Sequence, residues 1–455
     1  MGKGIIEKTV EAPAKVLEEA VDESKKVISA VTGNKPARKL KEYWQILGPG
    51  LTTGAADDDP SGIATYSQIG AGYGFKFIWL AGFTFPLMAV VQEMCARIGL
   101  VTGRGLAGNI RKFFPKWVLI LCTVLLFVAN TFNIGADLGA MSEVIRLFYP
   151  TWNYFYLIVA VSVVIIILEV FVSYRQYSKY LKWLSLVLFS YILSTLLIKG
   201  LNWGDIGLAA IHPVFGFSKD EILIVTGALG TTISPYLFFW QPSQEIEEHG
   251  QGKGMMEADN KMQNKFIKDM RIDVWSGMFL SNLVMFFIIA ACAATLNANG
   301  ITTIGTAAEA ARALRPLAGD YSYFLFAIGI IGVGLLGIPI LAGSSSYALA
   351  ESFGWRQGLH YKLRQAYAFY GVIIISISIG VLLNLFGLDP IKALIYSAIL
   401  NGCIAPVVMI LILILSSSEK IMGRWKSGFP SKAVGIIATA LMTTAGIATI
   451  WSIFG

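Results

Sequence analysis

The 455-residue sequence predicts an all-α polytopic membrane protein. Hydrophobic residues make up 55% of the chain and charged residues only 14%, and the mean hydropathy is +0.64, which lies outside the range of a soluble domain. Apolar runs that approach the length of a membrane-crossing helix recur between charged loops, and we count about eleven of them. We expect helices because these runs are too long and uniform for barrel strands.

The expected spans, with boundary errors of a few residues, cover residues 45–70, 75–101, 117–147, 153–174, 180–199, 221–247, 272–297, 321–350, 365–386, 391–416 and 432–453. They divide the chain into a cytoplasmic N-terminal tail (1–44), a first five-helix repeat (45–199), a second five-helix repeat (221–416) and an additional transmembrane helix (432–453). Residues 1–40 are charged throughout, so we expect no secretory signal there.

The charge distribution predicts the orientation. Loops that the span count places on one side hold most of the 36 Lys and Arg residues, as the positive-inside rule requires of cytoplasmic loops. We therefore expect a multi-pass protein of the plasma (inner) membrane with a cytoplasmic N-terminus, and we expect no nucleic-acid partner. The four cysteines, all in apolar segments, predict neither a disulfide framework nor a thiolate metal site.

Two spans contain residues unsuited to a continuous helix. Residues 48–62 combine glycines, two prolines and the acids Asp57, Asp58 and Asp59, and residues 227–236 place Gly230, Thr231, Ser234 and a proline at mid-span. Both spans are predicted to unwind there. They are the first and sixth of eleven, so the breaks occupy matching places in a LeuT-type 5+5 inverted repeat, whose substrate site lies at the bilayer midplane. The halves show no obvious sequence identity, so the breaks alone support the repeat.

The three consecutive acids predict a cation site. An ionised carboxylate at membrane depth costs at least about 2.5 to 3.5 kcal/mol, so a bound cation, water or a half-helix N-terminus must compensate. Successive residues turn by about 100°, so the acids do not all face one point, and we expect Asp59 to be the principal ligand. The alternative is that the acids only cap a helix that begins near Ile63. For the second break, the alternative is an ordinary proline kink.

Oxygen atoms dominate both breaks, and oxygen ligands suit Mg²⁺, Ca²⁺ and Mn²⁺. The candidate metal-site residues are Ala56, Asp57, Asp58, Asp59, Ser61, Gly62, Gly230, Thr231, Ser234 and Tyr236. Other polar residues at membrane depth are coupling or gating candidates. Glu93 and Arg97 are four residues apart, a spacing that favours an ion pair on one helix face. Asp137 is a candidate for a cation or proton pathway. Asn401 offers either an amide oxygen to the ion or a helix-packing contact.

The sequence resembles the NRAMP family of divalent metal transporters from Gly48 onward. The family's first-span Asp-Pro-Gly-Asn is similar to residues 59–62, its second-span ending resembles residues 92–103, its third-span Asp-Leu resembles residues 137–138, and its sixth-span Met-Pro-His falls on residues 234–236. The match over residues 92–103 is the most specific. The resemblance implies a LeuT-type fold of eleven or twelve helices that transports divalent metal ions.

Several family ligands are replaced. Gly62 stands where the family has a metal-binding Asn, Ser234 where it has a Met, and Tyr236 and Gln241 where it has His, which makes Gln241 a further coupling or gating candidate. Ala140 stands where the family usually has a Glu after the third-span Asp-Leu. Such departures resemble a divergent branch of NRAMP-related magnesium transporters, for which the resemblance implies a partly hydrated Mg²⁺.

The sequence thus predicts secondary-active or facilitated transport of divalent cations by alternating access, with Mg²⁺ as the preferred cargo and Mn²⁺ also accepted. The first alternative is a proton-coupled Mn²⁺/Fe²⁺ symporter, the second a LeuT-fold transporter of a small organic solute, and the third a channel or a non-transporting sensor. We expect no enzyme and no cofactor apart from the transported ion. The oligomeric state is open and is compatible with a monomer.

Overall fold

The computed structural model describes residues 35–214, 216, 218–249, 259–387 and 390–454. The chain forms two compact units, residues 1–47 and residues 48–455. The described part of the first unit is helix α2, Lys35–Ile46, so most of the predicted tail lies outside the described residues. Every feature discussed below belongs to the second unit.

The second unit is helical throughout its described residues, which contain no strand. Its α-helices are α3 (Pro49–Asp57), α4 (Pro60–Tyr73), α5 (Trp79–Thr102), α6 (Leu106–Phe113), α7 (Lys116–Phe148), α8 (Tyr154–Phe171), α9 (Tyr174–Leu184), α10 (Phe189–Leu196), α11 (Trp203–Ile211), α12 (Lys219–Thr232), α13 (Pro235–His249), α14 (Asn260–Thr295), α15 (Ala307–Ala318), α16 (Asp320–Phe353), α17 (Tyr367–Leu385), α18 (Pro390–Ser417), α19 (Glu419–Met422) and α20 (Phe429–Phe454).

Nine spans in the described part of the chain are long and apolar enough to cross a membrane. The other two expected spans are divided into shorter helices. The first breaks between α3 and α4, as predicted. The fifth consists of α9 and α10 joined by the 3₁₀ turn η1 (Ser185–Leu188), an interruption that was not expected from the sequence. The short helices α6, α11 and α15 occupy segments that were expected to be loops.

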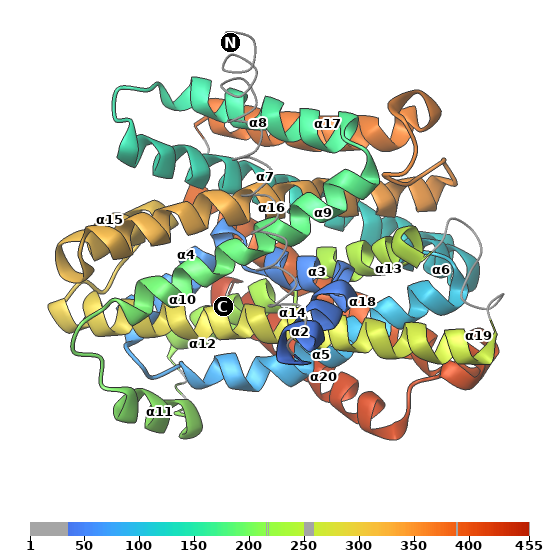
Figure 1. Ribbon diagram of the computed structural model, residues 1–455, viewed down its shortest axis with the longest axis horizontal. Coiled ribbons are helices and arrows are strands. Elements are labelled where there is room, and N and C mark those ends of the chain that lie inside the picture. The colour runs from blue at the N-terminus through green and yellow to red at the C-terminus, as the bar shows by residue number, and fades with distance from the viewer. Residues whose placement is uncertain (1–34, 215, 217, 250–258, 388–389, 455) are drawn as a thin grey trace, which may run out of the picture. The chain divides into compact units, whose positions relative to one another are not determined.

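The two halves of the first broken span pack on α14. A Cβ atom added at Gly54 would overlap the backbone carbonyl of Gly277, and one added at Gly70 would lie 2.5 Å from the carbonyl oxygen of Ile289. Only glycine permits backbones to approach so closely, as in other membrane helix pairs. The other face of α3 contacts α16, so the break lies at the centre of the helices that surround it (Figure 1).

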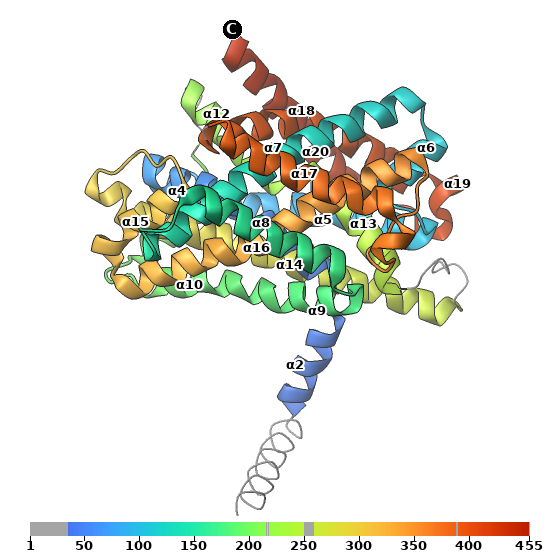
Figure 2. The same ribbon diagram turned by 90° about the horizontal axis from the view of Figure 1, so that it is seen from above.

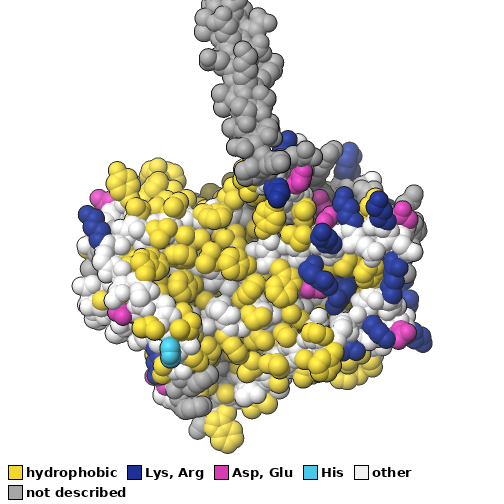
Figure 3. Space-filling view, turned by 60° about the horizontal axis from the view of Figure 1, so that its bottom comes forward, with side chains coloured by type: hydrophobic (Ala, Val, Ile, Leu, Met, Phe, Trp, Pro, Cys, Tyr) yellow, Lys and Arg dark blue, Asp and Glu magenta, His cyan; other side chains and the backbone are white. Residues whose placement is uncertain are grey.

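The remaining helices surround this centre. Helix α7 packs on α16, α17 and α18, while α8 and α17 lie side by side and α10 runs along α14 and α16 (Figure 2). Many large apolar side chains of α7, α8, α10, α17 and α20 remain exposed. Figure 3 shows hydrophobic side chains spread over much of one face and Lys and Arg gathered toward one end of it. This pattern is typical of a helical membrane protein.

Candidate metal site

The first break forms where the sequence combines acids with proline. Helix α3 ends at Asp57, Asp58 has non-helical dihedral angles, and Asp59 is the N-cap of α4, which starts at Pro60. The carboxylate oxygen Oδ1 of Asp59 accepts hydrogen bonds from the Gly62 amide at 2.9 Å and from the Ser61 hydroxyl at 2.5 Å. Proline in the first turn leaves no unpaired donor. Asp59 therefore does cap a half-helix, but the span begins at Pro49 and not near Ile63.

The three acids do not all face the same helix. The second oxygen of Asp59 accepts a hydrogen bond from the side-chain amide of Asn133 on α7 at 2.9 Å. The hydroxyl of Ser281 on α14 lies 2.9 Å from Oδ2 of Asp57 and 3.4 Å from Oδ1 of Asp58. All three carboxylates are buried, and one oxygen each of Asp57 and Asp58 has no hydrogen-bond partner in the described structure. Asp59 is thus directed differently from its two neighbours.

The second break also forms at its predicted place. Helix α12 ends at Thr232, and α13 begins at Pro235, so the span is interrupted and not merely kinked. The hydroxyl of Ser234 lies 3.0 Å from the carbonyl oxygen of Gly230 and 2.7 Å from that of Thr231, so it bonds two carbonyls at the helix end. The Tyr236 hydroxyl donates a hydrogen bond to the carbonyl oxygen of Ala56 at 2.8 Å. This bond joins the two breaks directly.

A small cavity of about 30 Å³ lies between the breaks, which is room for about one or two water molecules. The side chains that line it offer only hydroxyl and amide groups, apart from the glycines. The lining residues are Ser61, Thr65, Asn133, Gly227, Gly230, Thr231, Ser234, Ser397 and Asn401. Asp59 is not among them, but both its side-chain partners, Ser61 and Asn133, are.

The structure gathers some of the candidate residues at this cavity and leaves others away from it. Ser61, Gly230, Thr231, Ser234 and Asn401 line it. Gly62 lies at its edge, since a Cβ atom there would be 3.4 Å from the Thr231 hydroxyl. The candidates Ala56, Asp57, Asp58 and Tyr236 do not line it. In the described residues no three His, Cys, Asp or Glu side chains are grouped so that they could hold a metal ion.

Two of the coupling candidates lie close to the cavity. Asp137 is on α7, one turn after Asn133, and is fully buried, and neither carboxylate oxygen has a hydrogen-bond partner among the described residues. Asn401 of α18 lines the cavity, and its amide oxygen is also unpartnered in the described structure. Gln241 of α13 instead donates to Glu245 at 2.8 Å, which directs it away from the lining.

The predicted ion pair between Glu93 and Arg97 is present on α5, at 3.4 Å. It belongs to a larger network, because Glu93 also accepts hydrogen bonds from Arg271 at 3.0 Å and from the indole of Trp275 at 2.8 Å. Arg97 donates in addition to Ser427 at 2.8 Å. The network joins α5 to α14 and to the segment before α20, and none of these side chains lines the small cavity. A gating role for it remains a prediction.

Sequence reasoning missed several contributors, including Thr65 of α4, which lines the cavity. Ser281 hydrogen-bonds Asp57, yet a lone serine in an apolar helix carries no signal that separates it from a packing residue. Ser397 lines the cavity from α18 and is similarly inconspicuous. Asn133 is one of the polar residues of the third span, but its role as a partner of Asp59 was not predicted. Its spacing of four from Asp137 places both on one helix face, and this pattern is the signal that could have identified it.

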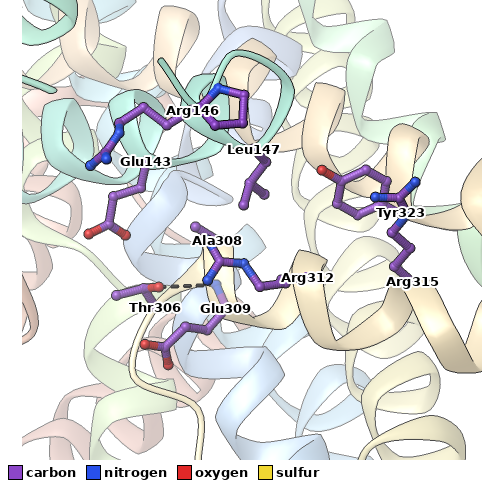
Figure 4. Close-up of a pocket in the computed structure, with 10 residues that line it drawn as sticks. Glu143, Arg146, Leu147, Thr306, Ala308, Glu309, Arg312, Arg315 and Tyr323 are labelled. Atoms are coloured by element: carbon purple, nitrogen blue, oxygen red, sulfur yellow. Dashed lines mark hydrogen bonds between the residues drawn. The ribbon is translucent and has the colours of Figure 1, made fainter. Parts of the chain in front are cut away.

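A larger pocket of about 490 Å³ lies elsewhere, between the end of α7 and α15 (Figure 4). Glu143 and Arg146 enter it from α7, and Glu309, Arg312 and Arg315 from α15. Figure 4 shows the backbone amide of Glu309 bonded to the Thr306 hydroxyl, at 3.1 Å. Because its guanidinium groups would repel a metal cation, we place no metal site there.

The sequence and the fold both match known proteins. Residues 50–452 match the sequence model of the natural resistance-associated macrophage protein-like (Nramp) family. The fold is similar to a manganese transporter of Eremococcus coleocola, crystallised with an aromatic bis-isothiourea substituted compound, at a TM-score of 0.72 and 16% identity over 91% of this chain and 88% of that one.

A second, more distant likeness is to Mhp1 in its inward-facing conformation, at a TM-score of 0.53 and 16% identity over 89% of each chain. Mhp1 with bromovinylhydantoin bound, described as a nucleobase-cation-symport-1 family transporter, matches at 0.52 and 15% identity over 89% of this chain and 92% of that one. These matches confirm the predicted fold class, a LeuT-type 5+5 arrangement with the first and sixth spans broken. At such identities they establish the fold alone.

Proposed function

Because the chain belongs to the natural resistance-associated macrophage protein-like (Nramp) family, we propose that it transports divalent metal cations across a membrane by alternating access, with Mg²⁺ preferred and Mn²⁺ accepted. The observation that carries the preference is the lining of the cavity between the breaks. Its side chains present hydroxyl and amide groups and no thioether, thiolate or imidazole. Oxygen atoms are the ligands that Mg²⁺ and Mn²⁺ prefer, whereas softer metals favour sulfur and nitrogen.

Asp59 supplies the charge in this proposal. It is held by Ser61, Gly62 and Asn133, so its carboxylate is fixed beside the cavity. Mg²⁺ demands octahedral geometry and retains several waters, and the cavity of about 30 Å³ is too small for such a hydrated ion. We infer that this conformation is closed, and that the helices around the cavity must separate before a partly hydrated ion can bind.

The same cavity argues against an organic cargo. A site for an organic solute is usually lined mostly by apolar and aromatic side chains. The residues that line this cavity are instead small and polar. An amine or amino acid would need an apolar or aromatic wall, which the residues lining this cavity do not provide.

Uptake driven by membrane potential tests the proposal. The potential favours inward movement by about 2.3 kcal/mol per charge per 100 mV, so a divalent ion needs no proton to drive its entry. We expect liposomes containing the purified protein to take up Mg²⁺ and Mn²⁺ when an inside-negative potential is imposed at equal pH on both sides. Uptake that occurs only with a pH gradient would overturn the uncoupled mechanism.

The runner-up, a proton-coupled Mn²⁺/Fe²⁺ symporter, is favoured by Asp137. This carboxylate is fully buried on α7, one turn after Asn133, which donates a hydrogen bond to Asp59. In a symporter, Asp137→Asn would abolish metal-driven proton uptake, recorded with a pH dye inside liposomes. In the uncoupled mechanism, wild type and variant are both expected to move metal without moving protons.

A change at Ser234 should alter metal selectivity. We expect Ser234→Met to raise Cd²⁺ affinity by about tenfold or more, equivalent to about 1.4 kcal/mol, because it adds a soft thioether to the cavity lining. Isothermal titration with Cd²⁺ and Mg²⁺ measures the effect. Ser234→Leu is the matched control, since leucine has a similar volume but no sulfur. An equal Cd²⁺ affinity in both variants would argue that Ser234 does not face the ion.

Removing the partner of Asp59 should weaken metal binding without abolishing the fold. We expect Asn133→Ala to reduce Mg²⁺ affinity by about 10- to 100-fold, the usual effect of losing a group that orients a metal ligand. Asn130 is the matched control because it is also buried on α7 but donates to Leu341, Ser344 and Ser345 of α16. If Asn130→Ala and Asn133→Ala weaken titrated Mg²⁺ binding equally, the loss is structural.

A further inference from the structure

A second site is indicated by a pocket of about 490 Å³ at one end of the helix bundle. It lies among the end of α5, the beginning of α14 and the residues that lead into α20. Five of its lining residues are basic, namely Arg97, Lys268, Arg271, Arg424 and Lys426, and no lining residue is acidic. We call it the basic pocket. The positive-inside distribution predicts that this end of the bundle faces the cytoplasm.

The acids around the basic pocket neutralise only part of its charge. Glu93 pairs with both Arg97 and Arg271, and Glu419 pairs with Lys426 at 2.6 Å. Arg424 donates to the neutral side chain of Gln263 at 2.7 Å. Lys268 has no ion pair among the described residues. Five cations thus share two carboxylates, which leaves a concentrated positive charge.

Two buried donors in the basic pocket also lack acceptors. Arg97 is 5% exposed, and its Nε atom has no hydrogen-bond partner in the described part of the chain. The indole nitrogen of Trp425 also has no hydrogen-bond partner among the described residues. The Trp425 ring itself packs against the Arg424 guanidinium, whose Cζ atom lies 4.8 Å from the ring centroid. A buried donor without an acceptor is costly. These two atoms therefore point to an acceptor-rich ligand.

We propose that the basic pocket binds the phosphate of an anionic phospholipid headgroup. A phosphate offers several acceptor oxygens and negative charge, which match the guanidinium and indole donors. The surroundings favour a lipid over a soluble anion, because α14 and α20 both pack on α5 and carry exposed apolar residues, including Phe279, Phe429 and Ile436. Basic pockets between helices at the cytoplasmic surface are typical sites for such headgroups.

The test measures phospholipid retention by the full chain. We would purify the protein in detergent, add phosphatidylglycerol or the zwitterionic phosphatidylcholine, and follow bound lipid by native mass spectrometry. The pocket variant carries Lys268→Gln and Arg424→Gln and spares Arg97. We expect wild type to prefer phosphatidylglycerol, and the pocket variant to bind it roughly thirtyfold more weakly, given about 1 kcal/mol for each basic residue.

The matched control carries Lys261→Gln and Arg364→Gln, two exposed basic residues outside the basic pocket. It should keep wild-type affinity, and the pocket variant should unfold at the wild-type temperature in detergent alone. Equal losses in both variants would show general charge attraction, and full retention in the pocket variant would exclude the site. If inorganic phosphate binds the basic pocket as tightly as phosphatidylglycerol, the lipid assignment is overturned.

Discussion

Replacing Asp59 with alanine is expected to reduce Mg²⁺ and Mn²⁺ uptake by more than about a hundredfold, because loss of a group that merely orients a ligand already costs about 10- to 100-fold. Asp59 is the acid whose side-chain partners, Ser61 and Asn133, both line the cavity between the breaks. Its loss removes the carboxylate that these two lining residues hold beside the cavity. Uptake into liposomes, followed with a fluorescent indicator and normalised to reconstituted protein, measures the effect.

Two further variants separate charge from structure. Asp59→Asn keeps an oxygen that can accept from the Gly62 amide, so α4 stays capped while the charge is lost, and we expect the same fall in uptake. Asp57→Asn alters an acid that faces Ser281 on α14, so we expect a smaller loss. Wild-type uptake by a well-folded Asp59→Ala protein would remove Asp59 from the proposed site.

Replacing Asp273 with alanine is expected to destabilise the fold by roughly 3 kcal/mol or more, since each buried donor left unpaired costs about 1 to 3 kcal/mol. Its carboxylate accepts hydrogen bonds from the backbone amides of Gly48 at 2.7 Å, Gly50 at 2.7 Å and Leu51 at 3.0 Å. The residues at the start of α3 provide no side-chain cap, so Asp273 caps this helix from α14. Thermal unfolding in detergent, followed by tryptophan fluorescence, measures the loss.

Asp269 provides the matched control for this variant. It is an acid on the same helix, one turn earlier, and has no hydrogen-bond partner among the described residues. Asp269→Ala should therefore leave the unfolding temperature nearly unchanged. If the two alanine variants unfold at the same temperature, the three amide contacts of Asp273 contribute nothing to the fold.

The positions of both breaks were predictable because they depend on local chemistry. Proline removes a backbone donor, and consecutive acids are unstable in a lipid-facing helix. The prolines in residues 57–60 and 230–235, together with the acids in the first of these segments, therefore predict the two interruptions without any knowledge of tertiary contacts. The interruption of the fifth span was not predictable. Residues 185–188, Ser-Leu-Val-Leu, contain no proline or glycine, and their 3₁₀ turn forms where this segment packs against α16, a tertiary contact that is invisible in the sequence.

The arrangement of the acids was only partly predictable. The helical turn angle indicated that three successive residues do not all face one point, and in the structure Asp57 and Asp58 lie near Ser281 whereas Asp59 meets Asn133. Which helix each acid meets depends on how α7 and α14 pack, and a single sequence does not contain that information. The small size of the cavity was equally inaccessible, because it results from side chains contributed by α4, α7, α12 and α18 together.

The close contacts of Gly54 and Gly70 with α14 also bear on how the two broken spans move. Backbone atoms in contact leave no room for sliding, so in the proposed transport cycle α3 and α4 would move with α14 as one rigid unit. On α12, Gly227 makes no comparable approach to α4, since a Cβ atom there would still be 3.9 Å from Thr65. The second broken span is instead held to α5 through α13, since a Cβ atom at Gly99 would lie 2.5 Å from the carbonyl oxygen of Pro242, so in the proposed transport cycle the two broken spans would each move with a different neighbouring helix.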